Sequence, residues 1–208
     1  MLIGSRRWFL GVCVALLPFV GALSEERGPR MGIFTKPGAR LDLTRPFTDS
    51  EGETSSLATL SLPGRPFILV PVFYRCPRLC GMTVSGVVDL VNRLQPALGI
   101  DYSVILYSFN ADDTTRDAAE KRAKTVPRIG KQPVTAREVR FLTAKREVID
   151  AINDELGFRV RFADKELEHS SAIFIVAADG AVTRYFAGVE FDPVKVATAL
   201  HEATPSGR

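Results

Sequence analysis

The chain has 208 residues, a length that predicts about one domain plus an extension and that can bury a core without disulfide staples. Its 27 basic and 24 acidic side chains nearly balance, and the basic residues do not gather in one run, so nothing favours nucleic-acid binding. With 46% hydrophobic and 25% charged residues, the composition is that of a folded globular protein.

The N-terminal segment, residues 1–23, differs from the rest of the chain. Arg6 and Arg7 precede an uncharged apolar run, and small residues at 20–22 suit cleavage by a signal peptidase. The run is shorter than the about 20 residues of a membrane span. We therefore expect a cleaved signal peptide first and an uncleaved membrane anchor second, and the arginine pair also resembles a twin-arginine signal. Cys13 is expected to be an apolar residue of this run.

Residues 24–45 are rich in glycine, proline and charge, which predicts a linker, and the domain is expected to span residues 46–208. If the leader directs export, the mature protein is periplasmic or otherwise extracytoplasmic. It then holds one even pair of cysteines, Cys76 and Cys80, in an oxidising compartment.

The domain alternates predicted strands and helices. An apolar, β-prone run at 66–74 precedes the two cysteines, and valines at helical spacing follow them until Pro96. Further strands are predicted at 102–109, 158–162, 171–177 and 182–186, and further helices at 115–125, after Thr143 and from Pro193. Residues 126–139 are irregular and basic, which indicates a solvated surface loop.

Caps and turns mark the ends of these elements. The expected ones are Asp113 or Thr114 with Asp117 at one helix start, Thr143 and Gly157 around the next helix, and a hairpin turn at Asp179-Gly180. This order of elements predicts an α/β fold in which a mixed β-sheet is flanked by helices.

The two cysteines lie where a buried strand turns into a helix. The positive end of a helix stabilises a thiolate, and Arg75 and Arg78 add positive charge, so we expect lowered thiol pKa values. Pro77 suits a first helical turn because it has no N–H to leave unpaired.

The spacing of Cys76 and Cys80 allows both sulfurs to point the same way within one helical turn. By itself it leaves three hypotheses open: a structural disulfide, a redox pair and a metal site. Two thiolates suit Cu(I), and an added imidazole suits Cu(II) or zinc as well. The sequence offers two histidines, of which His169 directly precedes a buried strand, whereas His201 is expected to be exposed near the tail.

Three stretches together carry a resemblance to a known family. They are FILVPVFYRCPRLC at 67–80, YSVILYSFNADDTT at 102–115 and HSSAIFIVAADGAVTRYFAG at 169–188. From about Pro46 to Ala203 the chain resembles the SCO/SenC family, thioredoxin-fold copper proteins of the cytochrome oxidase assembly pathway. The resemblance implies a thioredoxin-like fold and copper held by Cys76, Cys80 and His169.

The chain departs from the family pattern at two positions. Gly81 stands where proline usually follows the second cysteine, and the acidic loop opens with Asn110 where aspartate is common. The expected ligands remain intact, so the departures bear on partner recognition and on the supporting role of that aspartate.

The leading hypothesis is a copper metallochaperone that passes its metal to an apo-copper protein. The resemblance implies cytochrome c oxidase subunit II as recipient, together with a copper donor protein, and the N-terminal segment implies a membrane contact. The runner-up is an exported thiol-disulfide reductase with Cys76 attacking and Cys80 resolving. Two features argue against this reductase. Thioredoxin-like reductases have two residues between the cysteines, whereas this chain has three. They also have a proline just before the strand that faces the cysteines, whereas the corresponding stretch here, LEHSS at 167–171, contains no proline. Two further hypotheses rank below these: a peroxidase, and a domain in which the cysteines form only a structural disulfide.

Overall fold

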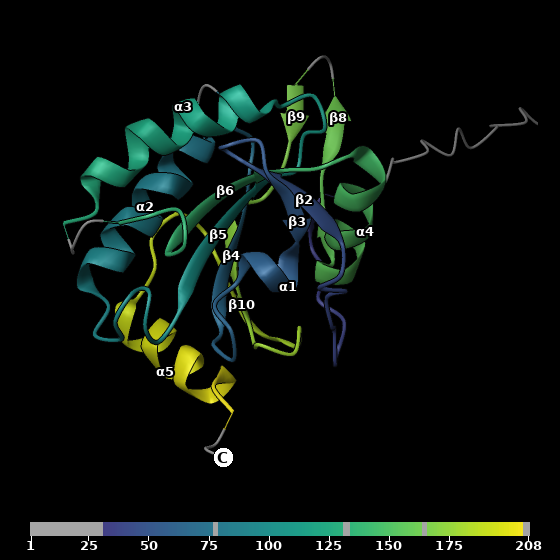
Figure 1. Ribbon diagram of the computed structural model, residues 1–208. Helices are drawn as coiled ribbons and strands as arrows, with labels where there is room; N and C mark the ends of the chain where they lie inside the picture. Colours follow the sequence, from purple (N-terminus) through teal and green to yellow (C-terminus); the bar gives the residue numbers. More distant parts are fainter. Residues whose placement is uncertain (1–30, 77–78, 131–133, 164–165, 206–208) are drawn as a thin grey trace, which may run out of the picture.

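The computed structural model describes residues 31–76, 79–130, 134–163 and 166–205 (Figure 1). The predicted leader, the first part of the predicted linker, Pro77 and Arg78 lie outside the described residues. The helices are α1 (Leu57–Leu60), α2 (Leu79–Arg93), α3 (Thr115–Thr125), α4 (Arg146–Leu156) and α5 (Pro193–Ala203), with a 3-10 turn η1 (Val126–Arg128). Among the described residues, no helix is both long enough and apolar enough to cross a bilayer.

A seven-stranded mixed sheet forms the centre of the fold. Its strands, in spatial order, are β11 (Val182–Ala187), β10 (Ala172–Val176), β4 (Phe67–Val72), β5 (Ser103–Ser108), β6 (Val139–Thr143), β2 (Pro46–Asp49) and β3 (Thr54–Ser56). The central strands β4, β5 and β6 are parallel, and β10 and β2 join them antiparallel on either side. The predicted α/β fold with a mixed sheet flanked by helices is confirmed.

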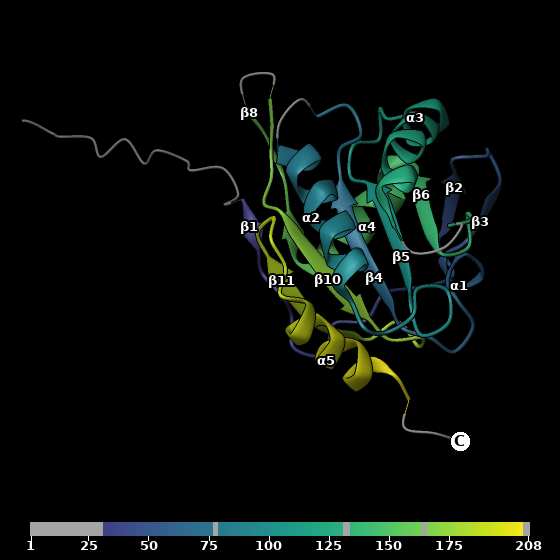
Figure 2. The ribbon, with the colours of Figure 1, turned by 90° about the vertical axis from the view of Figure 1, so that its left-hand side faces the viewer.

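Helices cover both faces of this sheet, as the two views in Figures 1 and 2 show. Alternate residues of a strand point to opposite faces, so Ile68 and Val70 of β4 pack with α2 and α5, whereas Phe67 and Leu69 pack with α1 and α4. All six residues of β4 and all six of β5 are buried, which agrees with the continuous apolar sequence of β4 and the apolar middle of β5.

Two short strand pairs lie outside the main sheet. They are β1 (Gly32–Ile33) with β7 (Phe158–Arg159), and β8 (Arg161–Ala163) with β9 (Glu166–Glu168). The single strand predicted at 158–162 is therefore divided between two partners. Residues 32–33, part of the predicted linker, pair with β7, and Leu41 from the same stretch is buried.

The segment before α4 differs from the sequence predictions in two ways. The described residues of the predicted loop at 126–139 contain the 3-10 turn η1 and are otherwise irregular up to Glu138, but Val139 already begins strand β6, which was not predicted. Thr143 is the last residue of that strand, and α4 begins after Lys145 without a side-chain cap. Sheet pairing with β5 decides this local structure. By contrast, Gly157 does close α4, in the left-handed conformation with φ of 65°.

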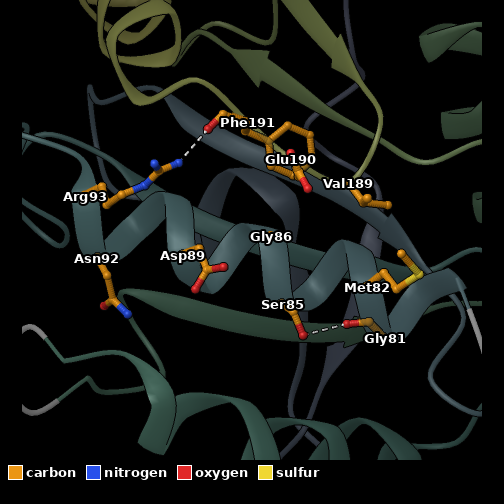
Figure 3. A pocket seen from close by; sticks show the side chains of 10 residues that line it. All are labelled: Gly81, Met82, Ser85, Gly86, Asp89, Asn92, Arg93, Val189, Glu190 and Phe191. Atoms are coloured by element: carbon orange, nitrogen blue, oxygen red, sulfur yellow. Dashed lines mark hydrogen bonds between the residues drawn. The ribbon is translucent and has the colours of Figure 1, made fainter.

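The capping of the other helices follows the sequence. Thr114 and Asp117 form a complete capping box on α3, and Asp192 caps α5 with proline at its first position. One close approach fixes how α2 lies against the chain after β11. A Cβ on Gly86 would lie 1.8 Å from the Val189 carbonyl oxygen, so only glycine allows this contact (Figure 3).

Candidate metal centre

Strand order brings the two cysteines and the histidine to one edge of the sheet. Cys76 lies in the turn after β4, and Cys80 lies in the first turn of α2. His169 lies between β9 and β10, at the start of a strand that runs antiparallel to β4. Because neighbouring antiparallel strands place the start of one beside the end of the other, His169 comes to the cysteine turn.

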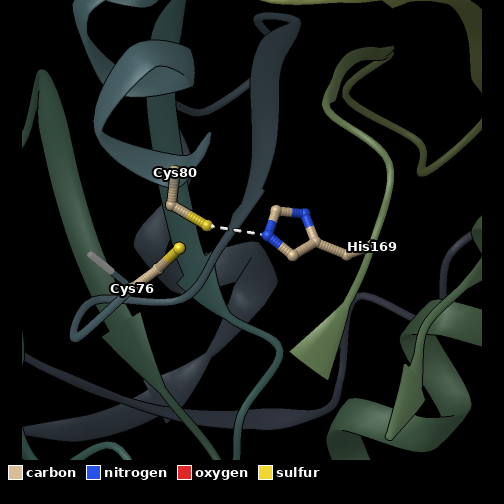
Figure 4. Close-up of side chains that lie close together, drawn as sticks. All are labelled: Cys76, Cys80 and His169. Atoms are coloured by element: carbon tan, nitrogen blue, oxygen red, sulfur yellow. Dashed lines mark hydrogen bonds between the residues drawn. The ribbon is translucent and has the colours of Figure 1, made fainter. Parts of the chain in front are cut away.

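The three candidate ligands face a common space (Figure 4). Both sulfurs and a ring nitrogen of His169 lie within 4.8 Å of one another. The Cys80 sulfur is 3.3 Å from His169 Nε2, and the two cysteines are not joined by a disulfide. Cys80 and His169 are buried, whereas Cys76 is half-buried. Cys76 is therefore the candidate ligand that an incoming molecule reaches first.

The hydrogen bonds of His169 fix which ring nitrogen is available. Nδ1 lies 3.0 Å from the Ser170 carbonyl oxygen, which can only accept, so Nδ1 carries the proton. Nε2 of the neutral ring then has a lone pair directed at the sulfurs. Burial lowers the pKa of His169, with the Ser170 bond opposing, so the ring is neutral near pH 7. A neutral imidazole with its other nitrogen held by an acceptor is the form that binds metals.

The Cys80 thiol differs from the sequence prediction. Burial raises its pKa to about 12, although the Phe73 N–H donates to its sulfur at 3.2 Å and lowers it. The expected lowering is therefore wrong for Cys80, because desolvation outweighs the helix end. Arg75 turns to Asp113, with Nε 2.9 Å from Oδ1. The apo thiol keeps its proton at neutral pH, and a metal ion must displace it.

Asp113 holds the cysteine turn from the neighbouring strand. Its carboxylate has a fully buried side chain and accepts the Tyr74 N–H at 2.7 Å, the Ser108 hydroxyl at 2.7 Å and Arg75 Nε at 2.9 Å. The parallel strands β4 and β5 end at the same edge, which puts the loop after β5 beside the turn after β4. Sequence reasoning gave Asp113 a capping role, and its place in the acidic loop after an apolar strand was the available signal.

A second contact ties the histidine segment to α2. The Thr83 hydroxyl donates to the Ser171 hydroxyl at 2.9 Å, and both residues are buried. Thr83 lies one helical turn after Cys80, and Ser171 lies two residues after His169. This bond therefore joins the segments that carry the two buried candidate ligands, and nothing in the local sequence pattern predicted it.

The two departures from the family pattern have different surroundings. A Cβ on Gly81 would meet nothing within 4 Å, so the position is open. Asn110 is buried, and its side-chain oxygen accepts the Asp112 N–H at 3.2 Å, which stabilises the loop that carries Asp113.

His201 is exposed on α5, as expected, and is not part of the cluster.

Comparison with protein families gives one match of almost the whole domain. The family model described as SCO1/SenC matches residues 36–204. The chain belongs to the SCO1/SenC family. Comparison with curated protein sequences gave no match.

Solved structures of Sco proteins share the thioredoxin-like fold. BsSco, described as a member of the Sco family of cytochrome c oxidase assembly proteins with a disulfide switch, has a TM-score of 0.64 at 21% identity, covering 83% of this chain and 99% of its own. Arabidopsis thaliana ScoI with copper bound has a TM-score of 0.60 at 14% identity, covering 77% and 97%. Yeast Sco1 with copper bound has a TM-score of 0.56 at 17% identity, covering 81% and 91%.

Within the described part of this SCO1/SenC chain, Cys76, Cys80 and His169 are the group that could hold a metal ion. Two sulfurs and one imidazole nitrogen form a soft to borderline donor set. Their assignment as ligands stays a prediction from the sequence, and the geometry is compatible with it.

Proposed function

We propose that the protein is a copper metallochaperone that binds one copper ion through Cys76, Cys80 and His169. The observation that carries the proposal is the convergence of two sulfurs and the unprotonated Nε2 within 4.8 Å. Thiolates favour Cu(I), and the imidazole extends the donor set to Cu(II). Two Sco proteins with copper bound support copper as the cargo.

The recipient in this proposal is an apo-copper protein, namely subunit II of cytochrome c oxidase, and a donor protein loads the site. The description of BsSco as a member of a family of oxidase assembly proteins supports this assignment. The predicted signal peptide or anchor at residues 1–23 supports an exported, periplasmic location. Half-buried Cys76 is the ligand that the recipient displaces first, because Cys80 and His169 are buried.

Reversible oxidation of the cysteines gates binding in this proposal. Thiol–disulfide exchange with an oxidised partner protein forms the Cys76–Cys80 disulfide and reduces the partner to its dithiol; the disulfide supplies no thiolate, so the oxidised protein releases copper. The dithiol form is the one that the structure describes.

Copper titration of the reduced protein tests the function. We expect stoichiometric binding, lost or weakened at least tenfold in Cys76→Ala, Cys80→Ala and His169→Ala. His201→Ala is the matched control, because this histidine is exposed on α5, and its binding should equal that of the wild type. Binding that persists unchanged in any of the three ligand variants contradicts the site.

The dithiol also leaves a thiol-disulfide reductase as the second candidate, since half-buried Cys76 can be approached from solvent. In this case an insulin-disulfide turnover assay without copper gives rapid reduction, abolished by Cys76→Ala. The high pKa of Cys80 opposes its role as a resolving thiolate. Slow turnover together with tight copper binding therefore favours the metallochaperone.

A further inference from the structure

A groove runs along the solvent face of α2 (Figure 3). It begins at the first turn of the helix, which carries Cys80. Its volume is about 750 Å³, and it lies between α2 and residues 189–191, which follow β11. Gly81 and Met82, the two residues after Cys80, line one end, and Arg93 lines the other. A molecule lying in this groove would therefore have one end beside the start of α2, where the cysteine turn enters the helix.

The wall opposite α2 is fixed against the helix by two contacts. At Gly86 the helix backbone and the Val189 carbonyl lie too close to admit a Cβ. At the far end, Arg93 Nη2 donates to the Phe191 carbonyl oxygen at 3.2 Å. The groove is thus preformed, which reduces the entropy lost when a partner binds.

The chemical character of the groove changes along its length. Met82 is 57% exposed at the end near Cys80 and offers an apolar contact. Asp89 of α2 and Glu190 of the opposite wall place two exposed carboxylates farther along. Neither carboxylate forms an ion pair with another described residue. Arg93 donates to the Phe191 carbonyl oxygen and Arg128 to the Ser85 hydroxyl at 3.0 Å, so both guanidinium groups stay charged but bind neutral acceptors rather than the two carboxylates.

We propose that this groove docks an extended segment of the protein that exchanges copper with this chain, a segment with an apolar side chain followed by a lysine or arginine. The apolar side chain contacts Met82, and the cation lies between Asp89 and Glu190. This inference rests on the proposed function, since it gives the chemistry of the partner of that same site.

The spacing of the partner residues follows from helix geometry. Met82 and Asp89 are seven residues apart in α2, which is about 10 Å at 1.5 Å per residue. An extended strand covers this distance in about three residues at 3.3 Å each. The partner motif is therefore an apolar residue, two spacers and a basic residue, with the apolar end nearest the metal centre.

Gly81 gives the groove its open end. A Cβ at this position meets nothing within 4 Å, so the space beside the helix is open there. This open space lies at the same end of the groove as Met82, where the apolar residue of the partner is expected, so a bulky side chain fits at that end.

A peptide titration tests the proposal. The probe is a hexapeptide with leucine at its second position and lysine at its fifth, compared with the same peptide carrying glutamate in place of lysine. In ¹⁵N-labelled reduced protein, the lysine peptide should shift the amide signals of Met82, Asp89 and Glu190 at millimolar concentration, and the glutamate peptide should not. Equal shifts from both peptides, or shifts confined to other residues, overturn the proposal.

Charge-neutral variants make the test specific. The double variant Asp89→Asn with Glu190→Gln keeps the shape and should weaken binding of the lysine peptide about fivefold, as expected for two exposed ion pairs. The matched control, Glu147→Gln with Asp150→Asn, changes two exposed carboxylates on α4, across the sheet, and should bind as the wild type does. Equal weakening by the control overturns the groove as the docking site.

Copper titration of the same variants separates this inference from the proposed function. The Asp89 and Glu190 variant should bind copper as the wild type does, because neither residue touches the three ligands. If the peptides behave as expected but copper does not bind, the function fails while the groove stands. If copper binds and the lysine peptide does not, the docking proposal alone fails.

Discussion

The two halves of the candidate metal centre are anchored in different ways. The cysteine turn lies between β4 and α2, and the buried carboxylate of Asp113 binds its backbone and Arg75. His169 lies between β9 and the sheet strand β10, its ring contacts the Phe109 ring at 4.8 Å between centroids, and its segment is held by the Ser170 carbonyl and the bond between Thr83 and Ser171. Both halves thus adjoin the main sheet, but the cysteine half is held by one buried carboxylate, whereas the histidine half is held by neutral hydrogen bonds and a ring contact.

The largest expected effect comes from breaking the cysteine half. Asp113→Ala leaves the Tyr74 N–H and Arg75 without their acceptor and should lower the free energy of unfolding by about 3 kcal/mol. Urea unfolding of the reduced apo protein measures this. Asp112→Ala is the control, because its side chain is exposed, and it should change stability by less than about 0.5 kcal/mol. Equal losses in the two variants would show that Asp113 does not hold the turn.

A smaller effect is expected from loosening the histidine half. Thr83→Val removes the donor to the buried Ser171 hydroxyl and should cost about 1–2 kcal/mol of stability. Copper affinity should fall about tenfold and the absorption spectrum of the Cu(II) form should change, because His169 is less well positioned. Thr83→Ser keeps the hydroxyl and should restore both readouts. An unchanged spectrum in Thr83→Val argues against a positioning role.

Acid and alkaline pH should separate the two halves further. The pKa of His169 is lower in the folded protein than in the unfolded chain, so on acidification the unfolded chain binds a proton before the folded protein does. The free energy of unfolding therefore falls as the pH drops below about 6.5, by up to about 1 kcal/mol per pH unit. The pKa of Cys80 is raised in the folded protein, so its contribution to the free energy of unfolding is fully present below pH 9.0 and is lost as the pH rises towards about 12. Urea unfolding of the apo protein at a series of pH values measures both losses, which we call the acid limb and the alkaline limb of the stability curve.

Substitutions assign each limb to one residue. His169→Gln should remove the acid limb and leave the alkaline one, and Cys80→Ser should do the reverse. Between pH 9 and 10 the effect of Cys80 precedes that of the buried tyrosines, whose pKa values burial raises above 10.0. If neither substitution changes its limb, other groups dominate the pH dependence.

The smallest expected effect is at Gly81. Gly81→Ala adds a Cβ that meets nothing within 4 Å and replaces glycine inside a helix, so stability should rise by about 0.5–1 kcal/mol. Copper affinity should not change, because neither half of the centre is touched. Thermal unfolding and a copper titration together test this, and a loss of affinity would mean that the turn needs glycine.

Much of the fold could be predicted because its signals are local. The buried runs of β4 and β5, the Thr114 and Asp117 capping box, Gly157 after α4 and Pro193 at the start of α5 each reflect residues that are near one another in sequence. The errors arose where distant residues decide. Strand β6 forms because β5 pairs with it, and Thr143 belongs to that strand.

The candidate site divides in the same way. The sequence alone determined the residue types, a cysteine pair at the junction of a strand and a helix and a histidine before a buried strand, because these depend on short-range pattern. Only the tertiary structure decided that His169 Nε2 meets the Cys80 sulfur, because the antiparallel placement of β10 beside β4 joins segments 89 positions apart. Burial then raised the pKa of Cys80, because desolvation is a property of the packed core and not of the neighbouring charges along the chain.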